Sequence, residues 1–560
     1  MMPKLEVRFV LPRMAEFDQF NLFGNDLPSS LRVEEAATRL GVSAATIRNW
    51  LKTDYLKSAG RGRVDFQSLV DIQSDTTGKV KLTHRANKSH KDSHDHDELK
   101  ERIIGYCRSR DRCPDQLAKE YEEALSDAYR NKEGVYYTPQ DTVSDLLGGS
   151  ILANQASTFC DPCCGSGNFI LKALELGIRP ENIYGYDIDP VAVELTKARI
   201  FHRTGFESPN IREIDFLEYA AKTPLRFDYI FTNPPWGKKI PRDRRLALGT
   251  RYGAGNSIDT CALFLFACLR CLNTDSCLGL LLPEAFFNIA SFEDARRMAL
   301  SLSIVRLIDY GRIFPGLMTK AQAIIVENNS QDPNDHVECR NAKSAFSRKK
   351  KSFKSNPKAI LNLNCDECDA EVVSYLFSLP HDTLEGQATW GIGIVTGNNS
   401  KFAKNRAHDG YIPVLKGSDI TQCGPRDPSC FIPSDLTLYQ QVAPADIYLA
   451  KKKMIYKFIS SKLLFICDDK QRFVLNSANV VIPDESFPVP MELMAQLLSG
   501  DFMNWIFNRV FCTHKVLRKD IEKLPIYSHL LAGMAEYDEQ AYLRGLSLVR
   551  QKNGTYRVKG

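Results

Sequence analysis

A short apolar run at residues 227–231 stops abruptly at Thr-Asn-Pro-Pro-Trp, residues 232–236. Because proline lacks an N–H and restricts the residue before it, we expect a strand that ends in a rigid, extended loop. The side-chain oxygen of Asn233 and the carbonyl of Pro234 can accept hydrogen bonds from one amino group, and Trp236 offers a flat face to a planar ring. The pattern indicates a site for an exocyclic NH2 on a base. The alternative is a proline-stiffened loop whose aromatic residue only packs.

The length of 560 residues exceeds what one hydrophobic core supports and predicts two to four domains. The formal charge of +5 is small for this length, so a nucleic acid would have to meet local basic patches. Residues 1–6 have no apolar signal core, and no run approaches the length of a membrane span. We therefore expect a cytoplasmic protein with 16 reduced cysteines. Cys365 and Cys368 lack a second pair of ligands, so we expect no metal site.

Residues 1–75 contain the pattern of a helix-turn-helix module. Val33 and Ala37 share one helical face, Gly41 breaks the helix, and Ser43 is a good N-cap for a second helix that carries Trp50. The segment resembles the short helix-turn-helix of the MerR and excisionase type, which implies DNA binding. A helical hairpin that docks a partner is the alternative. Residues 76–98 are polar without an apolar face, which predicts a linker.

Residues 157–176 predict a strand, a glycine loop and a helix, the start of a doubly wound α/β domain. In the loop, Gly165 and Gly167 let the backbone approach a ligand closely. The loop lacks the third glycine of the dinucleotide fingerprint and carries Asn168 and Phe169 after Gly167, which argues against a pyrophosphate. Since Asp161 can meet a cation, the loop suits S-adenosylmethionine, which carries positive groups and no phosphate.

Two further acids follow at the positions that such a cofactor needs. A second strand at residues 183–189 ends in acids, of which Asp187 is placed to accept hydrogen bonds from ribose hydroxyls. Farther along, Asp215 can accept the amino group of the cofactor's adenine, and Phe216 can cover its ring. The strand at residues 227–231 then delivers Asn233 to the same edge of the sheet.

The order of four motifs resembles that of the amino-group DNA methyltransferases: DPCCGSGNF, YGYDIDP, IDF and TNPPWG. An upstream YYTP resembles the additional cofactor motif of their gamma class, and the TaqI-like N6-adenine enzymes share the whole order. The resemblance implies that S-adenosylmethionine methylates adenine N6 in double-stranded DNA after base flipping. The implied catalytic residues are Asn233, Pro234, Pro235 and Trp236. The implied cofactor-binding residues are Tyr137, Thr138, Asp161, Pro162, Gly165, Gly167, Asn168, Asp187, Ile188, Asp215, Phe216 and Asn233.

Residues 237–256, just beyond the tetrad Asn233–Trp236, read as a long loop rich in cations. A run of charge is usually a solvated face, but this one lies beside the expected DNA site and can contact phosphates. The candidate phosphate contacts are Lys238, Lys239, Arg242, Arg244 and Arg245. Phe314 lies where TaqI-like enzymes place an aromatic residue against the flipped base. A position in the core is the alternative for Phe314.

The expected fold class is α/β, with a doubly wound Rossmann-like methyltransferase domain at residues 99–335. Lysine-rich, polar sequence suggests a linker at residues 336–384. Residues 385–560 have short, turn-rich strands that resemble the α+β target-recognition domain of TaqI-like enzymes. We find no acidic nuclease cluster in the sequence, which leaves a separate restriction endonuclease open as a partner. We expect no membrane partner.

Other substrates also present a planar NH2 to such a tetrad: cytosine N4, RNA and protein glutamine. The resemblance favours adenine, because cytosine N4 enzymes more often carry Ser than Asn at the position of Asn233. The large basic C-terminal half favours DNA. A non-catalytic DNA-binding regulator built on the helix-turn-helix is an alternative of another class. The complete set of Asp161, Asp187 and Asn233 argues against it.

Overall fold

The computed structural model describes residues 30–40, 47–48, 51, 56–60, 62–66, 68, 98–125, 134–151, 156–238, 240–329, 336–513 and 515–559. The chain forms two compact units, residues 1–99 and residues 100–560. Among the described residues, no helix combines the length and the apolar character needed to span a bilayer.

The first unit has a small core. Strands β1 (Ser30–Arg32) and β2 (Arg63–Asp65) pair antiparallel, and helix α1 (Val33–Leu40) follows β1 directly. Its buried side chains are Val33, Ala36, Ala37, Ile47, Leu56 and Val64. Helix α1 matches the first predicted helix. Gly41, Ser43 and Trp50 of the predicted turn and second helix lie outside the described residues, as do residues 76–97 of the predicted linker, so the helix-turn-helix stays a prediction.

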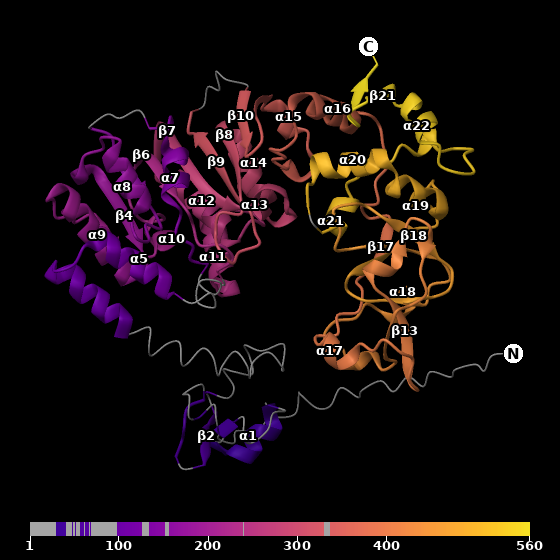
Figure 1. The fold of residues 1–560 in the computed structure, drawn as a ribbon, viewed down its shortest axis with the longest axis horizontal. Coiled ribbons are helices and arrows are strands. Elements are labelled where there is room, and N and C mark those ends of the chain that lie inside the picture. Colours follow the sequence, from indigo (N-terminus) through magenta and orange to yellow (C-terminus); the bar gives the residue numbers. More distant parts are fainter. Residues whose placement is uncertain are drawn as a thin grey trace. The chain divides into compact units, whose positions relative to one another are not determined.

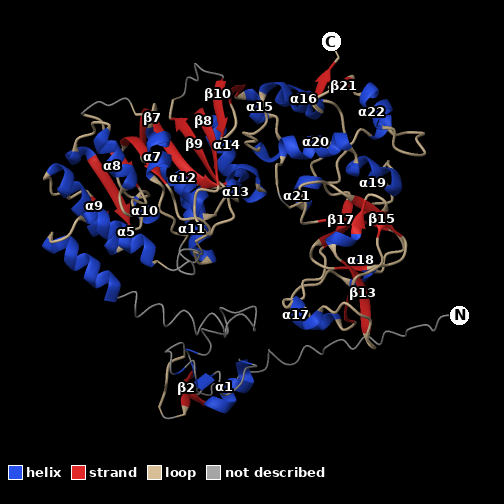
Figure 2. Ribbon diagram, viewed as in Figure 1, coloured by secondary structure: helices blue, strands red, loops and turns tan. Residues whose placement is uncertain are grey.

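The second unit contains a nine-stranded sheet, drawn in Figures 1 and 2, with the order β11-β10-β8-β9-β7-β6-β3-β4-β5. The strands are β3 (Phe159–Asp161), β4 (Ile183–Asp187), β5 (Ile211–Glu213), β6 (Phe227–Thr232), β7 (Leu272–Pro283), β8 (Ser303–Gly311), β9 (Ala321–Glu327), β10 (His336–Asn341) and β11 (Ala345–Lys349). Strands β3 to β7 are parallel, and β9 runs antiparallel to both β7 and β8. A mixed α/β fold with a large, parallel-rich sheet is therefore confirmed.

Helices cover both faces of this sheet. The chain steps from β3 to β4 and β5 toward one edge and from β6 to β7 toward the other, so right-handed crossovers place the two groups of helices on opposite faces. The helices are α5 (Pro114–Ala124), α7 (Gln140–Leu147), α8 (Asn168–Glu175), α9 (Pro190–Thr204), α10 (Phe216–Tyr219), α11 (Arg242–Tyr252), α12 (Thr260–Arg270), α13 (Glu284–Asn288) and α14 (Glu293–Ser301). Strands β3 and β6 are neighbours at the switch point, where ligands bind in folds of this kind.

The core of the sheet lies beside the loop after β6. Residues 276–283 of β7 are all buried, as expected for a strand that helices cover on both faces. Helix α12 buries residues 260–268 between β7 and the helices α10 and α14. The loop that carries the tetrad therefore starts beside a fully buried part of the sheet.

Two segments differ from the sequence predictions. Residues 237–256, expected as a loop, contain helix α11, in which Asp243 lies in the first turn and Gly253 ends the helix at a φ of 65°. Residues 336–384, expected as a linker, contain β10, β11 and helix α16 (Glu367–Ser378). Val337 and Cys339 alternate with exposed polar residues along β10, so a polar composition concealed a strand pattern.

The C-terminal part of the second unit combines two sheets with a cluster of helices. A four-stranded sheet has the order β12-β20-β17-β18, and a three-stranded sheet has the order β16-β13-β19. Their strands are β12 (Ala388–Gly391), β13 (Tyr411–Leu415), β16 (Cys430–Pro433), β17 (Lys453–Lys457), β18 (Phe465–Asp468), β19 (Phe473–Val474) and β20 (Ala478–Pro483). The helices are α17 (Asn399–Phe402), α18 (Ala445–Tyr448), α19 (Met491–Ser499), α20 (Asp501–Val510), α21 (Arg518–Ile521) and α22 (Glu539–Gly545), and the hairpin β21 (Leu548–Arg550) and β22 (Tyr556–Val558) ends the chain.

Buried polar contacts fix the segment between α15 (Lys351–Lys354) and α16 against the C-terminal part. The ammonium of Lys358 pairs with Asp520, and the side chains are 3% and 0% exposed. Burial lowers the pKa of Lys358 and raises that of Asp520. Nearby, Asn362 Nδ2 donates to the carbonyl of Arg509 over 2.8 Å. The segment is thus held by specific hydrogen bonds and one buried ion pair.

Candidate active site

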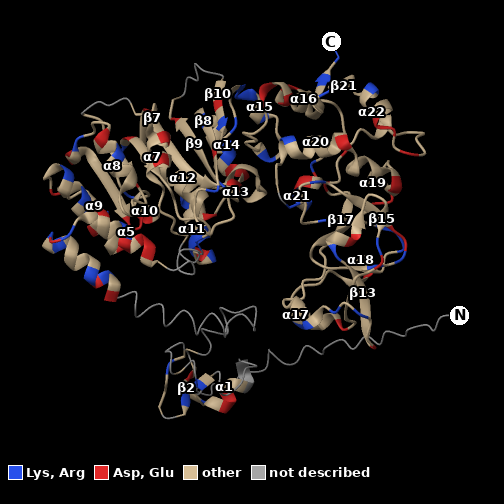
Figure 3. Cartoon of the chain, viewed as in Figure 1, with Lys and Arg blue, Asp and Glu red and all other residues tan. Residues whose placement is uncertain are grey.

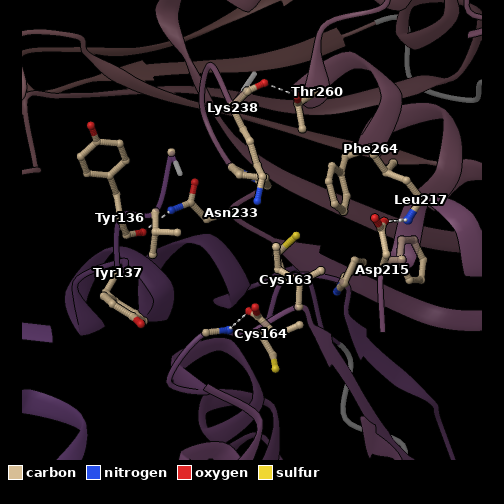
Figure 4. A pocket seen from close by; sticks show the side chains of 18 of the residues that line it. Tyr136, Tyr137, Cys163, Cys164, Asp215, Leu217, Asn233, Lys238, Thr260 and Phe264 are labelled. Carbon is tan, nitrogen blue, oxygen red and sulfur yellow. Dashed lines mark hydrogen bonds between the residues drawn. The ribbon is translucent and has the colours of Figure 1, made fainter. Parts of the chain in front are cut away.

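A pocket opens at the carboxyl ends of β3, β4, β5 and β6 (Figure 4). It brings together most of the residues that the sequence assigned to a cofactor. Those that line it are Tyr137, Thr138, Pro162, Gly165, Asn168, Asp187, Ile188, Asp215, Phe216 and Asn233. Asp161 and Gly167 lie behind this lining. Of the remaining predicted site residues, Pro235, Lys238 and Arg244 also line the pocket, whereas Pro234, Trp236 and Phe314 do not.

Asn233 has a fixed orientation at the end of β6. Its Nδ2 donates to the main-chain oxygen of Tyr136 over 2.7 Å, while its Oδ1 is buried and has no partner among the described residues. Turning the amide over would place two oxygens against each other, so the contact with Tyr136 determines which atom is the free acceptor. The side chain therefore presents an unfilled hydrogen-bond acceptor at the pocket.

The glycine loop is held close to its neighbours. Gly165 has a φ of 50°, and its N–H donates to Asp187 Oδ2 over 2.9 Å. Its carbonyl accepts from Thr196 Oγ1, also over 2.9 Å. Gly167 has a φ of 91°, and a β-carbon there would lie 2.9 Å from Thr196 Oγ1. Both glycines are thus required by backbone conformation and close approach.

Two carboxyl groups at this edge have raised pKa values. Asp161 is fully buried, which raises its pKa to about 7, although the Thr232 hydroxyl beside it and the Cys163 N–H act in the opposite direction. The Cys163 N–H reaches Asp161 Oδ1 over 3.1 Å, and no donor of a described residue meets Oδ2 with hydrogen-bonding geometry. Desolvation raises the pKa of Asp187 to about 6, against the hydrogen bonds it accepts from Asp189 and Gly165. Asp187 in the pocket wall and Asp161 at the end of β3 are thus acceptors whose charge responds to pH near neutrality.

Asp215 caps α10 and also pairs with Arg244. Its Oδ1 accepts from Leu217 N over 3.1 Å, and its Oδ2 contacts the Arg244 guanidinium. Arg244 also lies 3.5 Å from Glu218, which in turn pairs with Arg251 over 2.6 Å. The sequence suggested Arg244 as a phosphate contact. The structure instead places it in the pocket wall, where neighbouring acids balance its charge.

Trp236 and Phe314 pack into the core rather than facing an open site. Trp236 is 7% exposed and Phe314 is 5% exposed. Their rings meet edge to face at 5.2 Å, and Tyr136 lies 5.4 Å from Phe314. The expected exposed platform at Trp236 is therefore covered in this structure, and the alternative of a core position holds for Phe314. Trp236 was expected to offer a flat face to a base, because sequence alone does not show which aromatic neighbours surround it.

The remaining predicted cations are spread around the start of α11, where Lys and Arg gather (Figure 3). Lys238 lines the pocket, and Thr260 Oγ1 donates to its main-chain oxygen over 3.0 Å. Arg242 is exposed, and Arg245 is half-buried near Asp259. Lys239 lies outside the described residues.

Several pocket residues were not singled out from the sequence. Those are Gly134, Val135, Tyr136, Cys163, Cys164, Ser166, Phe169, Ile214, Leu217, Ile240, Thr260 and Phe264. Ile214 and Leu217 flank predicted residues in sequence and were available by adjacency. Phe264 comes from α12, whose uniformly apolar sequence gives no sign of which side chain faces a ligand.

Two family matches cover most of the second unit. Residues 112–365 match the family described as N-6 DNA Methylase. Residues 412–526 match the TaqI-like C-terminal specificity domain.

Whole-protein relatives extend these matches. The chain is 46% identical over 406 residues to the Type II methyltransferase M.VspI of Vibrio sp. (strain 343), which covers 72% of this chain and 100% of that protein. It is 23% identical over 219 residues to the modification methylase CviBIII of Paramecium bursaria Chlorella virus NC1A, covering 38% of this chain and 55% of that protein. The Type IIL restriction-modification enzyme MmeI, solved in complex with DNA, has a similar fold with a TM-score of 0.52 and 12% identity, over 76% of this chain and 72% of that chain.

Proposed function

Since the chain belongs to the N-6 DNA methylase family and is a DNA methyltransferase of the restriction-modification type, we propose that it methylates the N6 amino group of adenine in double-stranded DNA with S-adenosylmethionine as donor. The observation that carries the proposal is the orientation of Asn233. Its buried Oδ1 has no partner among the described residues, so it is free to accept a hydrogen bond from a group that enters the pocket.

The hydrogen-bond acceptors and apolar side chains at the pocket fit S-adenosylmethionine. Asp187 and Asp215 stand at the ends of adjacent strands, where they can accept from the ribose hydroxyls and the adenine amino group. Ile188 is 53% exposed and offers an apolar surface to the adenine ring. The unfilled Asp161 Oδ2 behind the glycine loop suits a cationic amino group. When bound, the cofactor supplies a methyl group on a positively charged sulfur.

The residues of the tetrad act on the substrate amino group. Because that group is paired inside the double helix, the adenine has to leave the stack before Asn233 can reach it. Asn233 Oδ1 and the Pro234 carbonyl then accept its two hydrogens and hold it in place. Asn233 needs no change of orientation on substrate arrival, because Tyr136 already fixes its amide. Such preorganised polar contacts are worth most where water is excluded.

Other parts of the chain serve DNA recognition in this proposal. Residues 412–526, which match the specificity domain, would read base edges in the major groove. The exposed Arg242 would contact a phosphate, and the N-terminal unit would add further DNA contacts. A separate restriction endonuclease would be the functional partner.

Mass spectrometry of nucleosides tests the proposal. Purified protein is incubated with unmethylated DNA and S-adenosylmethionine, and the DNA is digested to nucleosides. We expect N6-methyladenine as the product. N4-methylcytosine as the product would show that the substrate is cytosine rather than adenine. Unmodified DNA together with methylated RNA or protein would refute the substrate assignment.

A further inference from the structure

The segment at residues 134–138 joins the tetrad to the glycine loop through three carbonyls. The contacts are Trp236 N to Gly134 O (3.1 Å), Asn233 Nδ2 to Tyr136 O (2.7 Å) and Asn168 Nδ2 to Thr138 O (3.0 Å). The accepting residues are spaced by two, as along one side of an extended chain, and Pro139 restricts Thr138 to an extended conformation. One short segment thus accepts hydrogen bonds from both the tetrad and the residue that follows the glycine loop.

Two of these contacts determine how an amide side chain points. Asn168 Nδ2 faces Thr138 O, and its Oδ1 accepts from Arg199 over 2.9 Å, so both ends of this amide are occupied. Within the described part of the chain, Asn233 has only the contact with Tyr136 O, and its other end is the free acceptor at the pocket. Without Tyr136 O, nothing in these contacts would distinguish the two amide orientations of Asn233.

We propose that residues 134–138 are a positioning segment, which holds the Asn233 oxygen toward the substrate amino group and thereby sets the rate of methyl transfer. The inference rests on the proposed function, since it concerns the same site. The same segment supplies Tyr137 and Thr138 to the pocket wall. Its position therefore links the cofactor side of the pocket to the orientation of Asn233.

Gly134 is the residue through which the segment approaches the tetrad. It has a φ of 70°, and a β-carbon there would lie 2.5 Å from the carbonyl oxygen and 2.7 Å from the nitrogen of Trp236. Both are main-chain atoms, which cannot rotate away as a side chain can. Gly134→Ala should therefore push the segment away from the tetrad and lengthen the contact between Tyr136 O and Asn233.

Gly149 provides a matched control in the turn after α7. Its φ is 71°, almost the same as that of Gly134, but a β-carbon there would meet nothing within 4 Å. Gly149→Ala thus imposes the same backbone strain without the collision. A difference in rate between the two variants therefore reports the collision with the tetrad, separately from the backbone strain.

The test is the single-turnover rate of methyl transfer at saturating DNA and S-adenosylmethionine. We expect Gly149→Ala to remain within about twofold of the wild type, and Gly134→Ala to be slower by about 100-fold, as a displacement near 1 Å can cause. DNA affinity should change little in either variant. Equal rates for the two variants would overturn the positioning role. A wild-type protein that methylates no DNA would refute the proposed function instead, so the two failures are distinguishable.

Asn233→Asp gives an independent readout that also serves if Gly134→Ala does not fold. At about pH 8 the carboxylate cannot donate to Tyr136 O and is repelled by it, whereas near pH 5 a protonated carboxyl can donate. The ratio of the variant rate to the wild-type rate should rise at least about tenfold as the pH falls across this range. A constant ratio would mean that the donor to Tyr136 O is not needed, which contradicts the proposal.

Discussion

The indole N–H of Trp236 donates a hydrogen bond to the main-chain oxygen of Leu281 over 3.3 Å. Leu281 belongs to the buried part of β7, residues 276–283, beside β6. This contact ties the last residue of the tetrad to the core of the sheet. It also explains why a tryptophan occupies this position, since tyrosine and phenylalanine have no donor at the same place.

Substitution of Trp236 should therefore affect folding as well as catalysis. Trp236→Ala should lower the free energy of unfolding by about 3–5 kcal/mol, the usual cost of removing a buried aromatic side chain. Trp236→Phe keeps most of the packing and should lose only about 1 kcal/mol with the hydrogen bond. Urea unfolding followed by fluorescence measures the free energy of unfolding of both variants. An alanine variant as stable as the wild type would show that the ring is not a core anchor.

Substitution of Arg242 and of Arg244, both near the start of α11, should separate DNA binding from cofactor binding. Arg242→Ala should reduce the slope of log affinity for DNA against log salt by about 0.9, the value for one lost phosphate contact. Arg244→Ala should leave that slope unchanged and weaken S-adenosylmethionine binding by about 1 kcal/mol, because Asp215 loses its ion pair. A reduced salt slope for Arg244→Ala would restore its assignment as a phosphate contact.

The buried pair of Lys358 and Asp520 should matter far more than an exposed pair. Asp520→Ala strands a buried ammonium and should cost about 3–5 kcal/mol of stability. The matched control is Glu492→Ala, which breaks the exposed pair with Lys452 and should cost less than about 1 kcal/mol. Chemical denaturation of the two variants measures the free energy of unfolding that each has lost. Equal losses would argue against the role of Lys358 in fixing the segment.

Asp161 should make the wild type less stable as the pH rises. Its pKa is higher in the folded state, about 7, than its ordinary value of 3.8. The folded state then binds more protons between these values and loses stability as the pH increases through them. Asp161→Asn should abolish the loss, so its stability relative to the wild type should be greater at pH 8 than at pH 5, by about 3 kcal/mol at most.

Asp228 is the control for that experiment. Although burial opposes it, donors on Thr158 and Asn273 hold the pKa of Asp228 below its ordinary value. Its contribution to stability is therefore present above the ordinary pKa and is lost as the pH falls. Asp228→Asn should cost stability at pH 8, the opposite direction from Asp161→Asn. If both substitutions changed the stability at pH 8 in the same direction, the raised pKa assigned to Asp161 would be contradicted.

Local patterns in the sequence predicted the strands and helices around the site well. The run before Asn233 is strand β6, the run before Asp187 is β4, and the helix after the glycine loop is α8. These elements carry strong local signals: prolines, glycines and apolar periodicity. Contacts between distant residues could not be predicted in this way.

The surroundings of Trp236, Arg244 and residues 336–349 illustrate that limit. Trp236 is buried because Phe314 and β7 meet it from far along the chain. Arg244 pairs with Asp215 because α11 forms and lies beside α10. Residues 336–349 form strands because β10 pairs with β8 and β11 pairs with β10 at this end of the sheet. In each case tertiary context decided an outcome that composition had left open.

The most direct test of the central claim is the single-turnover rate of methyl transfer by Asn233→Ala, measured with its affinities for DNA and S-adenosylmethionine. Because the variant lacks the acceptor that Tyr136 O orients, the rate should fall by about 100-fold or more, the scale for one preorganised polar contact. Both affinities should remain close to those of the wild type. A variant that transfers methyl groups at the wild-type rate, or one whose affinities fall in proportion to its rate, would contradict the assignment of Asn233 to the reacting amino group.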